Sequence, residues 1–194
     1  VVDAGCGVGF LTAALAKQFG TVVGIDPSSE SIKLARNQNG DRASYIADTL
    51  ESYARDNKSS ADIVVANMVL MDVLELDNFL KAVCSVLKLN GTFIFSITHP
   101  CFWPRYYGYE HEPWFHYHEE IIVEGPFKIS SKPPTLHFST HVHRSLEAYT
   151  VAFTDAGLSL KKLLEPIPSK NIEVLYPEPW AYPRYLMGNC QRIS

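Results

Sequence analysis

The chain has 194 residues, 46% of them hydrophobic and 20% charged, which suits one folded α/β domain with a full core. The formal net charge of -4 provides no electrostatic footprint for nucleic acid or an anionic membrane, and the sequence has neither an apolar run of about 18 residues nor an export signal. The four cysteines, Cys6, Cys84, Cys101 and Cys190, show no C-x-x-C spacing. We therefore expect reduced thiols in a cytoplasmic protein that has no nucleic-acid or membrane partner.

Residues 1–10, with the sequence V-V-D-A-G-C-G-V-G-F, predict the end of a buried strand and a glycine turn, and residues 11–19 predict a helix. The chain begins inside this strand, so we expect half of the strand to be absent. Glycine reaches positive φ without strain and lets a ligand approach the backbone closely. The unpaired N–H groups at the start of the helix favour a cofactor at this turn, although a purely structural turn is an alternative.

The alternating glycines behind an acidic residue resemble motif I of the class I S-adenosylmethionine (SAM)-dependent methyltransferases. The dinucleotide pattern G-x-G-x-x-G/A is not met, because Phe10 stands where its last glycine would be. In the family a helix precedes this strand, and it is absent here. The residues that the resemblance assigns to the amino-acid end of SAM are Asp3, Gly5, Cys6, Gly7 and Gly9.

Residues 21–26 and 43–48 predict two further strands, which end in Asp26 and Asp48. Asp26 lies where Rossmann-type folds place a carboxylate for two ribose hydroxyls, whose donors match its two oxygens. A helix begins just after it, so a helix cap is the alternative. In the resembled family the residue at the position of Asp48 accepts a hydrogen bond from the adenine amino group. The neighbours assigned to the cofactor are Pro27, Thr49 and Leu50.

Residues 61–67 predict the fourth strand, which the sequence M-V-L-M-D follows. This stretch resembles motif IV, whose end faces both the methyl donor and the acceptor. The resemblance places Asn67 and Met68 at the cofactor and Met71 at the acceptor, while Asn67 satisfying only local backbone groups is an equal alternative. The N-P-P-Y/F sequence of enzymes that methylate adenine or glutamine amides is missing. Its absence argues against a nucleic-acid or protein-amide substrate.

Residues 79–89 predict a helix that ends at Asn90-Gly91, and residues 92–98 predict the fifth strand. The run L-K-L-N-G-T-F-I-F resembles the L-K-P-G-G-x-L-x-x junction of the family. Further helix and strand signals cover residues 143–155, 158–166 and 180–190. Alternating strands and helices predict a Rossmann-like, doubly wound α/β fold. By resemblance, its seven-stranded sheet is mostly parallel with helices on both faces, its last strand is antiparallel, and residues 1–194 form one domain.

Residues 99–143 form an insertion after the fifth strand that is rich in histidine and aromatic residues, the composition of a small-ligand pocket. It contains all seven histidines: His99, His111, His116, His118, His137, His141 and His143. His99 follows the strand directly, so we consider it a general base or a substrate-positioning group. The other residues assigned to the acceptor are Tyr106, Tyr107, Trp114, His116 and His141. Pairs at i, i+2 without a further ligand argue against a zinc site, so we expect no metal.

The resemblance implies transfer of a methyl group from SAM to an O or N atom of a small molecule by in-line displacement, with S-adenosylhomocysteine as product. A base is required only where the acceptor is protonated. Two alternatives stay open. An NAD(P)-binding oxidoreductase would share Asp26, but Phe10 and Asp48 disfavour it, and a non-catalytic SAM-binding protein would display the aromatic residues as an exposed patch.

Overall fold

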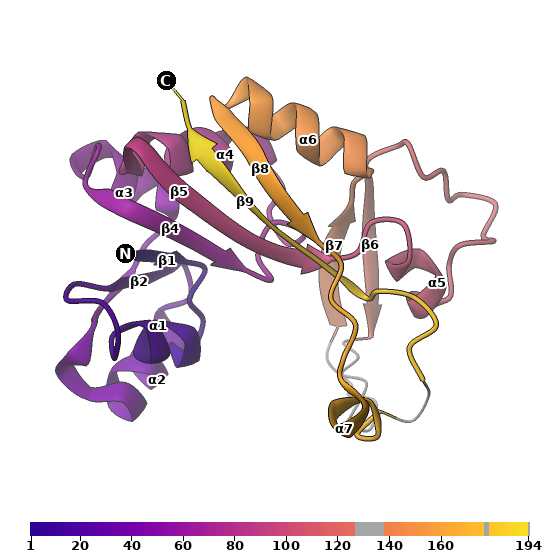
Figure 1. Cartoon of the computed structure of the whole chain (residues 1–194), viewed down its shortest axis with the longest axis horizontal. Coiled ribbons are helices and arrows are strands. Elements are labelled where there is room, and N and C mark those ends of the chain that lie inside the picture. Colours follow the sequence, from indigo (N-terminus) through magenta and orange to yellow (C-terminus); the bar gives the residue numbers. More distant parts are fainter. Residues whose placement is uncertain (127–137, 177–178, 194) are drawn as a thin grey trace.

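The computed structural model describes residues 1–126, 138–176 and 179–193, and it contains a seven-stranded sheet with the strand order β3-β2-β1-β4-β5-β9-β8 (Figure 1). Strands β1 to β5 run parallel, whereas β9 is antiparallel to both of its neighbours. The predicted mostly parallel sheet with an antiparallel last strand is confirmed. The strands are β1 (Val2–Ala4), β2 (Val23–Asp26), β3 (Ser44–Ala47), β4 (Ala61–Asn67), β5 (Leu87–Thr98), β8 (Leu158–Leu164) and β9 (Tyr185–Arg192).

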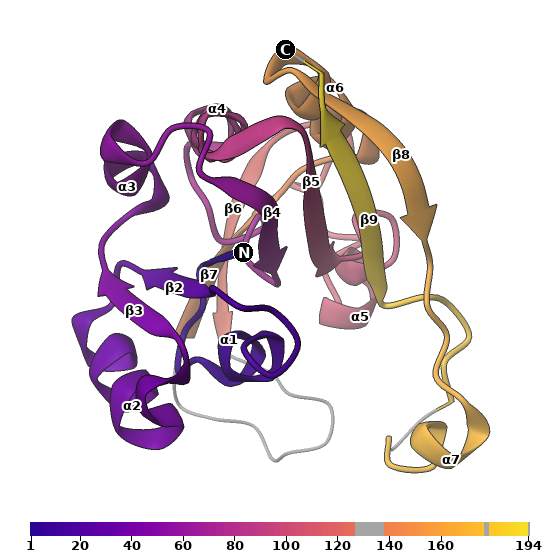
Figure 2. The same cartoon turned by 60° about the vertical axis from the view of Figure 1, so that its left-hand side comes forward.

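Helices cover both faces of this sheet, as expected for a doubly wound fold. Helices α1 and α2 lie together on one face, and α3, α4 and α6 pack side by side on the other (Figure 2). Within the described ranges no helix is both long and apolar enough to cross a membrane. The helices are α1 (Phe10–Leu15), α2 (Ser29–Asn39), η1 (Gly40–Arg42, a 3-10 helix), α3 (Leu50–Asp56), α4 (Leu76–Val86), α5 (Trp103–Tyr107), α6 (Leu146–Asp155) and α7 (Lys170–Glu173).

The largest part of the core lies between β5 and the helices α4 and α6. Alternate side chains of a strand point to opposite faces, so Phe93 and Phe95 are at most 1% exposed whereas Ile94 between them is 37% exposed. The ring centroids of Phe95 and Phe153 are 4.8 Å apart. A Cβ atom at Gly188 of β9 would lie 2.7 Å from the Phe95 ring, so glycine is required there for this packing.

The insertion after β5 contains α5 and a separate two-stranded antiparallel sheet, β6 (Ile121–Pro126) and β7 (Phe138–His143). Figure 1 shows both near the carboxyl ends of β4 and β5. The backbone N–H of Val142 in β7 donates to Met71 O in the loop after β4, at 2.7 Å. The expected aromatic insertion is therefore present and is bound to the edge where the parallel strands end. His137 lies outside the described residues.

Several predicted boundaries need correction. The helix expected over residues 79–89 is α4, which begins and ends three residues earlier because β5 already starts at Leu87. Asn90 has the expected left-handed φ of 64°, but it lies in an irregular part of β5 and not at a helix end. His143 belongs to β7, and α6 begins after Ser145, whose hydroxyl oxygen accepts a hydrogen bond from the Ala148 N–H.

Candidate active site

A cleft of about 320 Å³ lies where the carboxyl ends of β1 to β4 meet. Ligands of open α/β sheets bind at this edge. The structure brings seven of the twelve predicted cofactor residues to the cleft, although their contact with SAM stays a prediction. These seven residues are Gly5, Asp26, Pro27, Asp48, Thr49, Leu50 and Met68.

The three glycines of the turn have positive φ and different surroundings. A Cβ atom at Gly5 would lie 2.5 Å from the Val69 side chain, and one at Gly9 would lie 2.7 Å from the Tyr45 ring. At Gly7 the added atom would meet nothing within 4 Å. Gly5 and Gly9 are therefore required by packing, whereas Gly7 leaves the backbone open to a ligand.

The Asp26 carboxylate links the glycine turn to the end of β2. Its Oδ2 accepts from the Gly7 N–H at 2.8 Å and its Oδ1 accepts from the Ser28 N–H at 2.9 Å. Each carboxylate oxygen has a further lone pair, so the side chain could also accept two ribose hydroxyls. Helix α2 is capped by Ser28, whose Oγ accepts from the Ser31 N–H, so Asp26 is not the helix cap.

Two of the predicted cofactor residues, Asp3 and Cys6, do not line the cleft. Asp3 is 1% exposed, and its Oδ2 accepts a hydrogen bond of 2.6 Å from the Thr12 hydroxyl. Burial raises the pKa of Asp3 to about 6. Burial, together with Asp3 and Asp26, raises the pKa of the Cys6 thiol to about 12. Asp3 thus holds α1 to β1, and because it is buried and does not line the cleft, its direct contact with SAM stays a prediction.

The loop after β4 forms one wall of the cleft. Asn67 Oδ1 accepts from the hydroxyl group of the neighbouring Ser96 side chain at 2.7 Å, and whether Asn67 also contacts the cofactor stays a prediction. Sequence reasoning missed two acidic residues of the lining, Glu51 and Asp72. Desolvation raises the pKa of Asp72 to about 6. Their proximity in the chain to Leu50 and Met71 was the signal that could have identified them.

The described lining of the cleft includes four acidic side chains and no lysine, arginine or histidine. The sulfonium and ammonium groups of SAM are positive, whereas a dinucleotide carries a negatively charged diphosphate. An acidic lining therefore favours SAM over a dinucleotide, because the protein field attracts the ligand of opposite sign. The four residues are Asp26, Asp48, Glu51 and Asp72.

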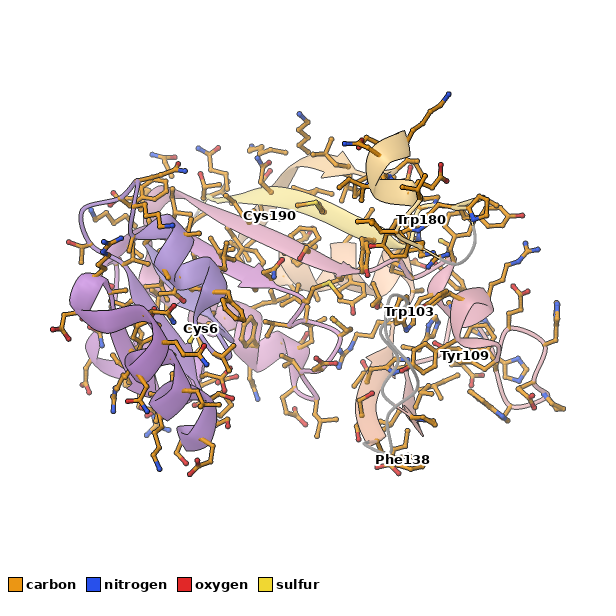
Figure 3. The ribbon with its side chains drawn as sticks, turned by 90° about the horizontal axis from the view of Figure 1, so that it is seen from below. Cys6, Trp103, Tyr109, Phe138, Trp180 and Cys190 are labelled. Carbon is orange, nitrogen blue, oxygen red and sulfur yellow. The ribbon has the colours of Figure 1, made fainter. Side chains whose placement is uncertain are left out.

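Three of the predicted acceptor residues, Tyr107, Trp114 and His141, converge on Tyr109 in the insertion. The Tyr109 hydroxyl lies 3.3 Å from His141 Nε2, and the Trp114 ring centroid lies 5.5 Å from that of Tyr109. Burial lowers the pKa of His141 to about 4, so its ring is neutral at pH 7. Figure 3 shows Tyr109 and Trp103 together on the insertion side, far from Cys6.

The remaining acceptor candidates have other surroundings. The ring centroid of Tyr106 lies 6.4 Å from that of Tyr107, and the Arg184 guanidinium stands 4.6 Å from the Tyr106 ring centroid. His116 is exposed beside His118, and Met71 is buried with its backbone oxygen bonded to Val142. No group of three or more potential metal ligands occurs within the part of the chain that the structure describes.

His99 is 2% exposed and makes a hydrogen bond with each ring nitrogen. Its Nδ1 accepts from the Cys101 N–H at 3.2 Å, so the proton lies on Nε2, which donates to Glu165 Oε1 at 2.9 Å. Neither nitrogen offers a free lone pair in this arrangement. The role of His99 as general base stays a prediction, and it requires the ring to release the Cys101 amide.

Comparisons with known proteins agree with this geometry. Residues 2–95 match the methyltransferase domain family. The human ubiquinone biosynthesis O-methyltransferase is 34% identical over 102 residues, and the Vibrio parahaemolyticus enzyme of that name is 31% identical over 99 residues. Each match covers 50% of this chain but only 28% and 42% of the respective relative. The chain therefore matches less than half of the length of these curated relatives.

Solved structures show the same fold over nearly the whole chain. A protein from Listeria monocytogenes, proposed to be a SAM-dependent methyltransferase, has a TM-score of 0.80 at 21% identity and covers 98% of this chain and 88% of its own. The 1,6-didemethyltoxoflavin-N1-methyltransferase of Burkholderia thailandensis has a TM-score of 0.64 at 14% identity, covering 100% of this chain and 70% of its own. Residues 2–95 thus match the methyltransferase domain family, and the chain has the fold of the SAM-dependent methyltransferases, whose cofactor is SAM.

Proposed function

We propose that this chain transfers a methyl group from SAM to an oxygen or nitrogen atom of a small molecule. The observation that carries the proposal is the cleft at the carboxyl edge of the sheet. The lining of the cleft is acidic, and one of its residues, Asp26, binds the N–H of Gly7, which has open space around its Cα atom. The sequence relatives are named O-methyltransferases, which favours an oxygen acceptor over nitrogen.

In the cleft and beside it, each part of the cofactor has a matching group. Asp26 would accept the ribose hydroxyls, and Asp48 with the backbone at Thr49 and Leu50 would hold the adenine. The open backbone around Gly7 would hold the amino-acid end. When bound, SAM supplies an activated methyl group, so the task of the protein is to orient the acceptor in line and to exclude water.

On the acceptor side, we propose that residues 99–143 cover the small molecule. The cluster of Tyr107, Tyr109, Trp114 and His141 is aromatic, and its Tyr109 hydroxyl and neutral His141 ring bind each other, a composition that suits a partly apolar acceptor better than a polynucleotide. His99 is the candidate for a base or a positioning group beside it. The four cysteines, which form no disulfide, support a cytoplasmic location.

Calorimetry with S-adenosylhomocysteine tests the cofactor assignment. Charge-assisted hydrogen bonds contribute about 1.5 to 3 kcal/mol each, so we expect Asp26→Ala to weaken binding at least about tenfold. Because Asp26 also binds the Gly7 amide, Asp26→Asn should show an intermediate loss. Asp62→Asn is the matched control, since Asp62 pairs with Lys88 at the opposite edge of the sheet.

Unchanged affinity in a folded Asp26→Ala protein would remove Asp26 from the site. NADH binding by the wild type without binding of S-adenosylhomocysteine would instead favour the oxidoreductase alternative. Transfer of radiolabel from SAM into a metabolite extract, compared with RNA, DNA and protein fractions, tests the acceptor class. Label confined to a polymer fraction contradicts a small-molecule acceptor.

A further inference from the structure

The loop between β4 and α4, residues 68–75, forms a wall of the cleft without regular secondary structure of its own. Met68, Val69, Asp72 and Val73 all line the cleft from this loop. Irregular backbone needs partners outside itself, because buried carbonyl and amide groups are costly when unpaired. The position of this wall therefore depends on what binds its backbone.

The Met68 N–H binds Ser96 of β5, whereas three carbonyl groups of the loop have their partners at the junction between β7 and α6. Arg144 Nη1 donates to Leu70 O at 3.2 Å and Arg144 Nη2 donates to Leu74 O at 2.8 Å. The Val142 N–H donates to Met71 O at 2.7 Å. Three carbonyl groups of the loop are thus held by two residues that lie about seventy positions later in the chain.

Arg144 is buried, with 2% of the residue exposed, and its third nitrogen, Nε, takes part in a charge pair. Its Nε donates to Glu120 Oε2 at 2.6 Å, so the insertion neutralises the guanidinium. A buried charge is tolerated only when it is paired and hydrogen-bonded, and the planar guanidinium has several donors in fixed directions. A lysine in the same place has one nitrogen and cannot bind both Leu70 O and Leu74 O as well as Glu120.

We propose that Arg144 is a positioning residue, which fixes the loop 68–75 against the insertion and so sets the shape of the cofactor cleft. The inference rests on the proposed function, because it gives the cleft the role of binding SAM. Arg144 touches neither the cleft nor its ligand and acts through the loop. The same side chain joins the segment that carries Glu120 to the cofactor side of the molecule.

The test combines the affinity for S-adenosylhomocysteine with amide hydrogen exchange. We expect Arg144→Lys and Arg144→Met to weaken binding by about five- to tenfold, within the usual range for coupling between distinct sites. The Val142 amide and the loop 68–75 should exchange several-fold faster, while the amides of α2 keep their protection. In Arg144→Ala, millimolar ethylguanidinium should restore part of the affinity, which a merely destabilised fold would not do.

Arg192→Met is the matched control, because Arg192 also donates to a backbone carbonyl, Leu87 O, but at the amino end of β5. Equal losses of affinity in Arg192→Met, or unchanged affinity and exchange in a folded Arg144→Lys protein, overturn the inference. If Arg144→Met does not fold, Arg144→Lys and the rescue of Arg144→Ala by ethylguanidinium still test whether Arg144 positions the loop. A wild type that does not bind S-adenosylhomocysteine refutes the proposed function, whereas exchange at Val142 still tells whether Arg144 fixes the loop.

Discussion

The candidate sites in residues 1–98 and in residues 99–193 are built from different kinds of contact. In the first region the candidate cofactor residues are close in sequence to strand ends, and parallel strands bring those ends to one edge. In the second region the contacts join distant residues, as when His99 meets Glu165 and Arg105 donates to Tyr182 at 2.8 Å. A site built from backbone turns is therefore visible in sequence, whereas a site built from side chains of distant segments is not.

The largest expected effect tests this comparison within the glycine turn, where Gly9 and Gly7 have different surroundings. Gly9→Ala adds a methyl group 2.7 Å from the Tyr45 ring at a φ of 81°. We expect it to lower the free energy of unfolding by about 2 to 5 kcal/mol, the sum of left-handed strain and overpacking. Gly7→Ala has open space around its methyl group, so only the strain of about 1 to 2 kcal/mol remains.

Urea denaturation of both variants measures these losses, and calorimetry with S-adenosylhomocysteine separates their roles. For each kcal/mol of stability lost, Gly7→Ala should weaken the binding of S-adenosylhomocysteine more than Gly9→Ala does. The reason is that the methyl group at position 7 points to the open side of the turn. Equal losses of stability would show that the turn is uniformly packed and that Gly7 is not the open position.

The sequence predicted the sheet because local signals suffice for it. Short apolar runs, each closing on an acidic residue, define β1, β2 and β3, and residues 61–67 coincide with β4. The position of the cleft could be predicted for the same reason, since Asp26 is the last residue of β2 and Asp48 directly follows β3. The start of β5 could not be predicted, because Leu87 to Asn90 read as the end of a helix until pairing with β4 draws them into the sheet.

For the acceptor side, the sequence predicted the types of residue in the insertion but not their arrangement. Histidine and aromatic residues indicated a binding surface, but which rings meet depends on β6 pairing with β7 and on how α5 packs. Arg144 was seen only as part of a helix start, because its partners Leu70 and Leu74 belong to another segment of the chain. No local pattern marks a side chain that binds carbonyl groups of another segment.

A second prediction compares the two regions through the pH dependence of stability. Each region contains a buried titratable group, and burial raises the pKa of the one and lowers the pKa of the other. The folded state raises the pKa of Asp3 from 3.8 to about 6, so it favours the protonated form. This contribution to stability is fully present below pH 4 and is lost as the pH rises through about 6. At about 1.4 kcal/mol for each unit of pKa, the loss is on the order of 3 kcal/mol.

His141 behaves in the opposite way, because burial lowers its pKa from 6.5 to about 4. Its contribution is present above pH 6.5 and is lost as the pH falls toward 4, again by on the order of 3 kcal/mol. As the pH rises from 4 to 7, the free energy of unfolding of Asp3→Asn should increase relative to that of the wild type. As the pH falls from 6.5 to 4, the free energy of unfolding of His141→Gln should increase relative to that of the wild type. Urea denaturation at both ends of each range measures the difference, and parallel curves for the wild type and a variant would contradict its assignment.

The smallest expected effect concerns His99, where the two regions meet at the end of β5. General-base catalysis contributes about 10² to 10⁴ in rate, so a base role predicts that His99→Gln lowers the maximal rate by that factor. The bonds to Cys101 and Glu165 occupy both ring nitrogens and lead us to expect positioning instead. In that case His99→Gln and Glu165→Gln lower the rate alike, by less than about tenfold, the scale of one hydrogen bond of about 1 kcal/mol.

Transfer of radiolabel from SAM into a metabolite extract, at saturating SAM, measures the rates of both variants. The affinity for S-adenosylhomocysteine should be unchanged in each, because His99 lies outside the lining of the cleft. A loss of 10² or more that is confined to His99→Gln would establish the base role, since general-base catalysis is the larger of the two effects. The ring must then exchange its bond with the Cys101 amide for one with the acceptor.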